Sequence, residues 1–208
     1  MAVDSNMNKS NRSARNLTVR KSESGFTMLE VVISGAILVV GLVALLAVFS
    51  LSVAATQSAQ EDMIAKQVAS EAMESLFTAR NTSQVTWAQI QNVADGGIFK
   101  NGPQVVQDPG LDGLVGTADD VADPDPKCPG PARCLKTPGP DGMLGTSDDV
   151  YLPLNQFTRE IKIVPVPSPT GGNNPFLRQV TVTINYTTPQ FRQVQKTYVM
   201  SAYISQFR

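Results

Sequence analysis

Residues 26–49 of this 208-residue chain read FTMLEVVISGAILVVGLVALLAVF, an apolar run whose single charge is Glu30. The thirty residues between Glu30 and Glu61 carry no charge and no proline. In lipid such a segment satisfies its backbone hydrogen bonds only as a helix. At ~1.5 Å per residue it reaches ~45 Å, more than the ~30 Å hydrocarbon core of a bilayer. We therefore predict a transmembrane helix over residues 26–56.

The helical pattern continues beyond the apolar run. A stripe of apolar side chains at helical spacing comprises Ile64, Ala65, Val68, Ala69, Ala72, Met73, Leu76 and Phe77, and the charged residues expected on other faces are Glu61, Lys66, Glu71 and Glu74. This stripe needs a cover, either the chain's own sheet or a protein partner. The two patterns together predict one helix over residues 26–80.

Charge is distributed unevenly along the chain. Residues 1–25 hold five basic and two acidic side chains, whereas the remainder holds twelve basic and sixteen acidic ones. A basic flank before an apolar span keeps the start of that span in the cytoplasm, so residues 81–208 are expected on the other side of the membrane. The basic segment has no aromatic side chains, and no nucleic-acid partner is expected.

Residues 21–30, KSESGFTMLE, closely resemble the class III signal shared by type IV prepilins and type II secretion pseudopilins. The resemblance covers about residues 20–60. It implies that residues 1–25 are a leader, that a prepilin peptidase cuts between Gly25 and Phe26, and that Phe26 is then methylated. It also implies that Glu30 is the glutamate used in assembly. The implied fold is α+β, a long N-terminal transmembrane helix packed on a C-terminal antiparallel β-sheet.

The implied partners are the prepilin peptidase, other pilin or pseudopilin subunits and the inner membrane. The domain after the helix would lie in the periplasm and later in an extracellular filament, the type IV pilus. Many major pilins carry a proline within the helix, whereas all fourteen prolines here follow Gly102. Together with residues 65–74, AKQVASEAME, this is similar to a minor pilin of the pilus-modification type. A pseudopilin of type II secretion is one alternative, and a single-pass calcium-binding or adhesion module is another.

Glu30 is unusual because an ionised carboxylate within an apolar span costs about 2.5–3.5 kcal/mol on insertion scales and usually has a partner. Cleavage after Gly25 would create an amine at Phe26 that can pair with Glu30 of a neighbouring copy. Alternatively, Glu30 lies at the membrane interface and is hydrated.

Residues 101–156 are rich in Pro, Gly and Asp and are predicted to form a loop. The loop contains a repeat, PGLDGLVGTADDV at 109–121 and PGPDGMLGTSDDV at 138–150, identical at nine of thirteen positions. Its aspartates offer hard oxygen ligands for Ca²⁺, although the spacing is not that of an EF-hand; they are Asp112, Asp119, Asp120, Asp141, Asp148 and Asp149. The alternative is a pair of Asx- and Gly-stabilised turns with a solvated acidic rim. No other cofactor is expected.

Cys128 and Cys134 lie between the two repeats. In an oxidising compartment they are expected to form a small disulfide loop, the alternative being two reduced thiols. Two cysteines without histidine cannot form the usual zinc sites. The lack of histidine also excludes Ser/His and Cys/His catalysis, and an enzyme is not expected.

The carboxyl end predicts strands over residues 157–164, 177–186 and 191–205, with a turn at 187–190. In the second, Val180, Val182, Ile184 and Tyr186 share one face. A short helix is predicted over residues 87–93, capped by Thr86.

Overall fold

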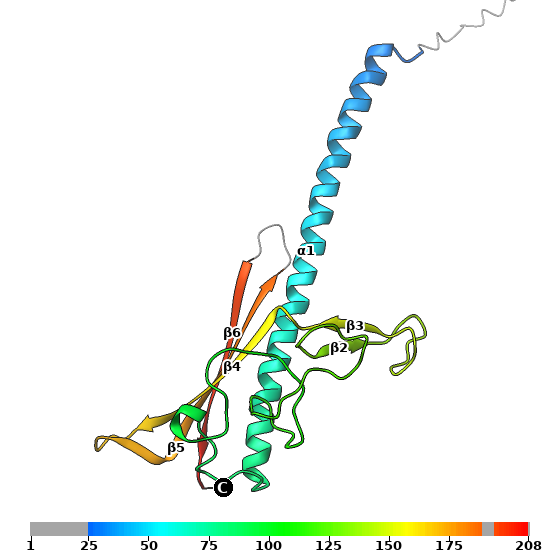
Figure 1. The fold of residues 1–208 in the computed structure, drawn as a ribbon. Coiled ribbons are helices and arrows are strands. Elements are labelled where there is room, and N and C mark those ends of the chain that lie inside the picture. Colours follow the sequence, from blue (N-terminus) through cyan, green and yellow to red (C-terminus); the bar gives the residue numbers. More distant parts are fainter. Residues whose placement is uncertain (1–24, 189–193, 208) are drawn as a thin grey trace, which may run out of the picture. The chain divides into compact units, whose positions relative to one another are not determined.

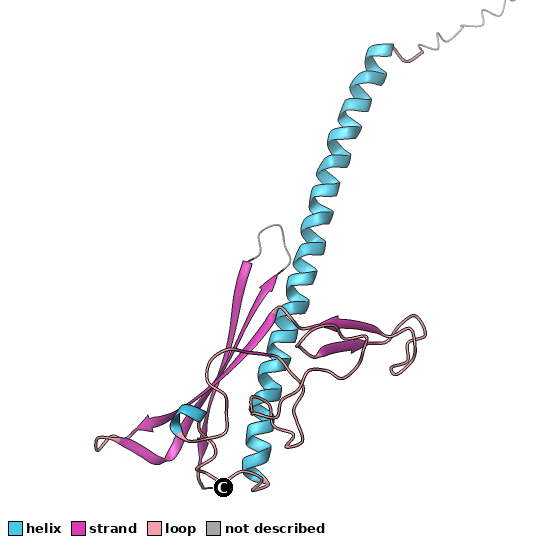
Figure 2. Ribbon diagram, in the orientation of Figure 1, coloured by secondary structure: helices cyan, strands magenta, loops and turns pink. Residues whose placement is uncertain are grey.

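The computed structural model describes residues 25–188 and 194–207. The leader predicted over residues 1–25 lies outside this range except for Gly25. The elements are α1 (Met28–Asn81), the 3₁₀ turn η1 (Val93–Asp95), β1 (Gln104–Val105), β2 (Cys134–Thr137), β3 (Val150–Pro153), β4 (Phe157–Pro167), β5 (Asn173–Thr188) and β6 (Val194–Ser205) (Figure 1). One long apolar helix and antiparallel β-structure thus give an α+β layout (Figure 2).

The chain divides into two compact units at Val48 and Phe49, within α1. In the first unit every described residue is exposed, from Gly25 through the apolar part of the helix. In the second unit α1 contributes buried side chains to the core of the domain; they are Ile64, Ala65, Val68, Ala69, Ala72, Met73, Leu76 and Ala79. The amphipathic stripe is therefore covered by the domain's own residues.

The burial of Glu61 differs from the sequence prediction. It was predicted to lie off the apolar stripe, but it is 8% exposed and one of its carboxylate oxygens has no hydrogen-bond partner. The reason is geometric, because Glu61 stands three residues before Ile64 and four before Ala65 and so shares their face of the helix. Burial raises the pKa of the Glu61 carboxyl above its usual value.

The main sheet has four antiparallel strands in the order β1-β4-β5-β6. Alternate residues of β5 from Val180 to Tyr186 point into the core, as the sequence pattern predicted. Thr187 and Thr188, predicted to begin a turn, instead continue β5 because they pair with Gln195 and Val194 of β6. The strand predicted from Phe191 begins at Val194 within the described range; Phe191 and the last two residues of the predicted turn lie outside it. The sheet and the part of α1 from Ile64 to Ala79 enclose one hydrophobic core.

The predicted loop at 101–156 is not wholly irregular. It supplies the two-residue edge strand β1, and β2 and β3 pair with each other as a separate antiparallel hairpin. Strands of two and four residues are too short for alternation to reveal. Tertiary pairing, rather than local pattern, defines them.

The helix predicted over residues 87–93 is replaced by turns and by η1. The Thr86 hydroxyl donates to Oε1 of Gln89 at 3.0 Å instead of capping a helix. Asn92 adopts an extended backbone, and its buried side chain donates to the Ile161 carbonyl at 2.7 Å and accepts the Ile163 N–H at 2.8 Å. The Asn92 amide thus completes the edge of β4 beside the short β1, and this geometry interrupts any helix there.

Candidate functional site

The residues predicted for processing and assembly lie just before α1 and in its first turn. Gly25 and Phe26 precede the helix, and Phe26 is 82% exposed. Thr27 occupies the N-cap position, where its hydroxyl accepts the Glu30 N–H at 3.3 Å. Glu30 is an acidic residue in the first turn, where the helix dipole favours negative charge. The sequence Thr-x-x-Glu at this point is that of a capping box.

Beyond Glu30, α1 presents a continuous apolar surface. Val31 through Leu51 carries no ionisable side chain, and every one of these residues is exposed. Within the described part of the chain, α1 is a helix that is long enough and apolar enough to cross a membrane. A surface of this kind on a soluble monomer would be unusual, and it is compatible with membrane anchoring.

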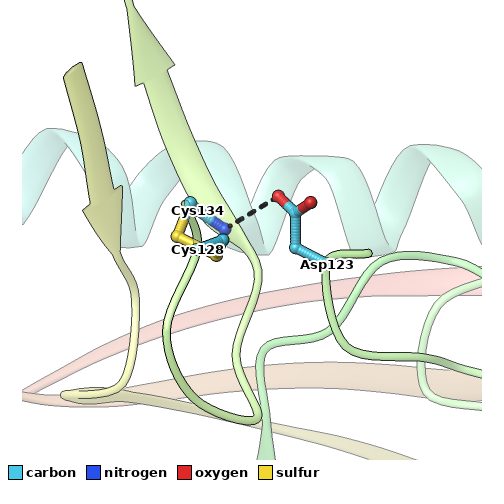
Figure 3. A group of neighbouring side chains, drawn as sticks. All are labelled: Asp123, Cys128 and Cys134. Atoms are coloured by element: carbon cyan, nitrogen blue, oxygen red, sulfur yellow. Dashed lines mark hydrogen bonds between the residues drawn. A yellow bond between two sulfur atoms is a disulfide. The ribbon is translucent and has the colours of Figure 1, made fainter. Parts of the chain in front are cut away.

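Cys128 and Cys134 are joined by a disulfide with a Cα–Cα distance of 5.8 Å. Figure 3 shows Asp123 beside them, where its carboxylate accepts the Cys134 N–H at 3.4 Å. Among the described residues these three form a cluster within metal-ligand distance, but both sulfurs are already bonded to each other. Disulfide sulfurs are not thiolates, so this cluster is not a metal site as it stands.

The two repeats fold alike. In repeat 1, residues 109–121, the Asp112 carboxylate accepts the Leu114 N–H at 2.8 Å and the Asp120 carboxylate accepts the Gly116 N–H at 2.7 Å. In repeat 2, residues 138–150, the corresponding bonds join Asp141 to Met143 at 2.8 Å and Asp149 to Gly145 at 2.7 Å.

The remaining aspartate also matches. Asp119 accepts the Thr117 hydroxyl at 2.8 Å, and Asp148 accepts the Thr146 hydroxyl at 2.6 Å. These bonds lower the pKa of both carboxyls below the usual value of 3.8.

Each repeat is closed at its neck by antiparallel pairing. Asp108, the residue before repeat 1, pairs with Val121, the last residue of that repeat. Thr137 and Val150 pair at the same positions of repeat 2. Within each loop the first glycine permits a close approach, because a Cβ on Gly110 or Gly139 would lie 2.3 Å from the backbone oxygen of the aspartate opposite. The repeats are therefore two copies of one braced loop.

The carboxylates proposed as calcium ligands are engaged within these loops. Each repeat uses its three aspartates to accept backbone N–H groups and a threonine hydroxyl. Among the described residues, no three aspartates of one repeat place ligand oxygens within 4.8 Å of one another. Calcium binding at the repeats stays a prediction.

The environments of the two loops differ. In repeat 1 Leu114 and Val115 are buried in the core, whereas the equivalent Met143 and Leu144 are 64% and 63% exposed. Asp120 also faces Arg159, with 3.6 Å between Oδ2 and Nη2 and with both side chains buried. Burial raises the pKa of Asp120 and lowers that of Arg159, because it disfavours the charged form of each side chain.

Two charged anchors were not identified from sequence. Arg133 forms a two-pronged ion pair with Glu71 of α1, both bonds measuring 2.6 Å. Arg159 occupies an inward-facing position of β4, where the alternation pattern favours an apolar side chain. The sequence indicates this role only through spacing, because Arg159 lies two residues from both Phe157 and Ile161 and therefore on their apolar face of the strand.

Comparison of the chain with protein-family models, with curated proteins and with solved structures gave no match.

Proposed function

We propose that this chain is a structural subunit of the minor-pilin type. It would be cut by a prepilin peptidase after Gly25, methylated at Phe26 and inserted through α1 into a type IV pilus or its initiating tip complex. The observation that carries the proposal is the exposed apolar surface of α1, which begins one turn after the Gly25–Phe26 junction. Before assembly lipid would cover this surface, and after assembly the helices of neighbouring subunits would.

The position of Glu30 supports an assembly role. It lies in the first helical turn, close along the chain to the amine that cleavage would create at Phe26. In a filament that excludes water, the carboxylate of one subunit and the terminal amine of its neighbour would compensate each other's desolvation. The same carboxylate is compatible with the helix dipole before assembly.

The proposal is tested first by intact-mass and amino-terminal analysis of membrane-extracted protein, produced with and without a prepilin peptidase. The expected product begins at Phe26, and its mass exceeds that of the unmethylated chain 26–208 by one methyl group. A Gly25→Leu variant should remain uncut. Gly35→Ala is the matched control, because a Cβ at Gly35 meets nothing within 4 Å and lies beyond the proposed cleavage site. A chain that stays whole in the presence of the peptidase contradicts the proposal.

Glu30→Ala separates processing from assembly. Cleavage and methylation should be unchanged, whereas the amount of the subunit in sheared filaments should fall at least tenfold. Ser34→Ala is a suitable control one turn later, since the Ser34 hydroxyl donates only to the Val31 carbonyl of its own helix. Normal incorporation of Glu30→Ala would refute the role given to the carboxylate.

A further inference from the structure

The two outer edges of the four-stranded sheet differ in how they are protected. The edge of β4 is covered by β1 over two residues, and farther along the Asn92 side chain bonds to the Ile161 carbonyl and the Ile163 N–H. Beyond these bonds the register of β4 shifts between Pro165 and Pro167. A covering strand, a side-chain cap, proline and an irregular register all protect a sheet edge from pairing with another strand.

The edge formed by β6 has none of these features. Within the described residues β6 pairs only with β5, and its register is constant from the pair Leu177–Ser205 to the pair Thr188–Val194. The strand is 12 residues long and contains no proline, and its one charged residue is Lys196, near its start. A long, regular edge strand without these protective features is able to pair with another strand.

The bonds at the end of β6 show which of its backbone groups are available. In an antiparallel pair every second residue bonds to the neighbouring strand. The Gln206 N–H donates to the Phe176 carbonyl on the β5 side at 2.9 Å, whereas the Ser205 carbonyl points away from β5 and accepts hydrogen bonds from Arg80. The residues whose N–H and C=O groups point away from β5 are therefore the odd-numbered ones. Between Lys196 and Arg80 they are exposed and uncharged, with Gln195 before them; together they are Gln195, Thr197, Val199, Ser201 and Tyr203.

A strand added at this edge would meet uncharged side chains on both faces. On the outer face it would lie beside Val199 and Tyr203, which are 55% and 62% exposed. On the inner face it would lie beside Tyr198 and Met200, which are partly buried against the core. Side chains of adjacent strands pack in such cross-strand pairs, so the complementary segment is uncharged and rich in β-branched or aromatic residues.

The direction of α1 excludes a symmetric pairing of two copies. Lys196, near the start of β6, bonds to Asp62 of α1 at 2.9 Å, and Ser205, at its end, bonds to Arg80. Between these contacts the helix rises ~27 Å and the strand ~30 Å, so the two elements run in the same direction. A two-fold pairing of β6 with β6 of a second copy would be antiparallel, and the two α1 helices would run in opposite directions. Copies anchored by α1 in one membrane cannot pair in this way.

We propose that the open edge of β6, residues 195–203, binds an extended, uncharged segment of a different protein, which adds a fifth strand to the four-stranded sheet. The backbone groups of the edge would provide the hydrogen bonds, and the side chains on the two faces would select the segment. The inference goes beyond the minor-pilin proposal and does not depend on it. It requires an anchor in a membrane but no filament, so a chain that no prepilin peptidase cuts would still bind the segment.

The test uses the full chain in membranes of its native host. A photo-crosslinking phenylalanine derivative is placed, one position at a time, at 197, 199, 201 and 203. Position 162 is the control, because Lys162 is exposed on the same face of the sheet but two strands away, through the pairs Lys162–Thr181 and Thr181–Ser201. The site of attachment of each adduct is mapped by mass spectrometry.

Strand pairing predicts a specific pattern of adducts. All four positions should link to one segment of one other protein, and the attachment site should advance by two residues for each step of two residues along β6. Adducts with a second copy, attachment sites that do not advance in step, or yields no higher than that from position 162 overturn the inference. Capture of a protein without this register does not support it.

A backbone variant then tests the hydrogen bonds themselves. Ser201→Pro removes an N–H that points away from β5, and proline is tolerated at such edge positions. It should lower the adduct yield from position 199 at least tenfold. Ser201→Ala is the matched control, because it removes the same hydroxyl, which lies 3.1 Å from Oγ1 of Thr181, but keeps the N–H; its yield should be unchanged. Equal yields for the two variants refute the pairing. An unchanged unfolding midpoint establishes that each variant is folded, and the mapped register decides the question if Ser201→Pro does not fold.

Discussion

The buried pair of Asp120 and Arg159 gives a quantitative test of how repeat 1 is held. The two side chains are 3% and 2% exposed, and Nη1 of Arg159 has no hydrogen-bond partner. Two unit charges 3.6 Å apart attract by about 4–5 kcal/mol at an effective dielectric constant of about 20. Removing one member of a buried pair costs about 3–5 kcal/mol, because the other charge stays buried without compensation.

Asp120→Asn keeps the shape of the side chain and an acceptor for the turn, but removes the charge. We expect it to lower the free energy of unfolding by about 3 kcal/mol. The matched control is Asp149→Asn in repeat 2, a buried carboxylate that accepts the Gly145 N–H but has no ion pair within the described residues. It leaves no opposite charge uncompensated, so it should change stability by at most about 1 kcal/mol. The two variants alter the same residue of the same motif, so the difference between them isolates the contribution of Arg159.

The assay is urea unfolding of the detergent-solubilised full chain, followed by fluorescence of Trp87. This is the single tryptophan, and its indole N–H donates to the Pro175 carbonyl at 2.8 Å, so its signal reports the folded domain. The double variant Asp120→Asn with Arg159→Met should regain most of the lost stability, because no charge is then left buried. If Asp120→Asn and Asp149→Asn unfold at the same urea concentration, the reasoning about the buried pair is wrong.

Three further predictions concern the loops. Cys128→Ser combined with Cys134→Ser should lower the free energy of unfolding by about 2 kcal/mol through loss of a short loop closure, and a reducing agent should have the same effect on the unaltered chain. Thr146→Val removes the hydroxyl that donates to Asp148, so the pKa of Asp148 should rise toward 3.8 in a carbon-13 NMR titration. Gly139→Ala should cost about 1–3 kcal/mol in the urea assay, because its Cβ would overlap the backbone oxygen of Asp148.

The sign of the pH effect follows from the lowered pKa. The folded chain holds Asp148 ionised more readily than the unfolded chain does, so the stabilisation is complete above pH 3.8 and is lost as pH falls through the folded-state pKa. An unchanged titration in Thr146→Val would exclude the hydroxyl as the cause. If Gly139→Ala is as stable as the unaltered chain, repeat 2 tolerates the displacement of Asp148. If the unfolding midpoint is unchanged without the disulfide, the surrounding residues hold the Cys128–Cys134 loop without that bond.

The helix and the long strands could be predicted because the hydrophobic patterns that specify them extend over many residues. The prediction of a helix over residues 26–80 agrees with α1, and the alternation from Val180 to Tyr186 agrees with β5. β1 and the β2–β3 hairpin were missed because strands of two and four residues carry too few alternations. The helix expected at 87–93 failed because the Asn92 side chain bonds to β4, a partner remote in sequence.

The loops show a different limit of sequence reasoning. The repeat was evident, and its turns follow from its Asp and Gly residues. Which copy is buried was not evident, because the two loops are nearly identical. Arg159 on β4 and the core around Phe99 and Ile161 decide that question, and they meet repeat 1 only in the folded domain. The positions of Gly25, Phe26 and Glu30 at the start of α1 follow from the sequence alone, whereas their proposed roles await the peptidase experiment.

The attachment of the last strand to the end of α1 has a consequence for the order of folding. Arg80 donates from Nε and Nη2 to the Ser205 carbonyl at 3.0 and 2.7 Å, across a sequence separation of 125 residues. β6 also pairs with β5 along its whole length. Contacts so distant in sequence form slowly, and these cannot form before synthesis has passed Ser205. Until then the edge of β5 that pairs with β6 has free backbone hydrogen-bonding groups, so the emerging domain is at its greatest risk of aggregation just before β6 is complete.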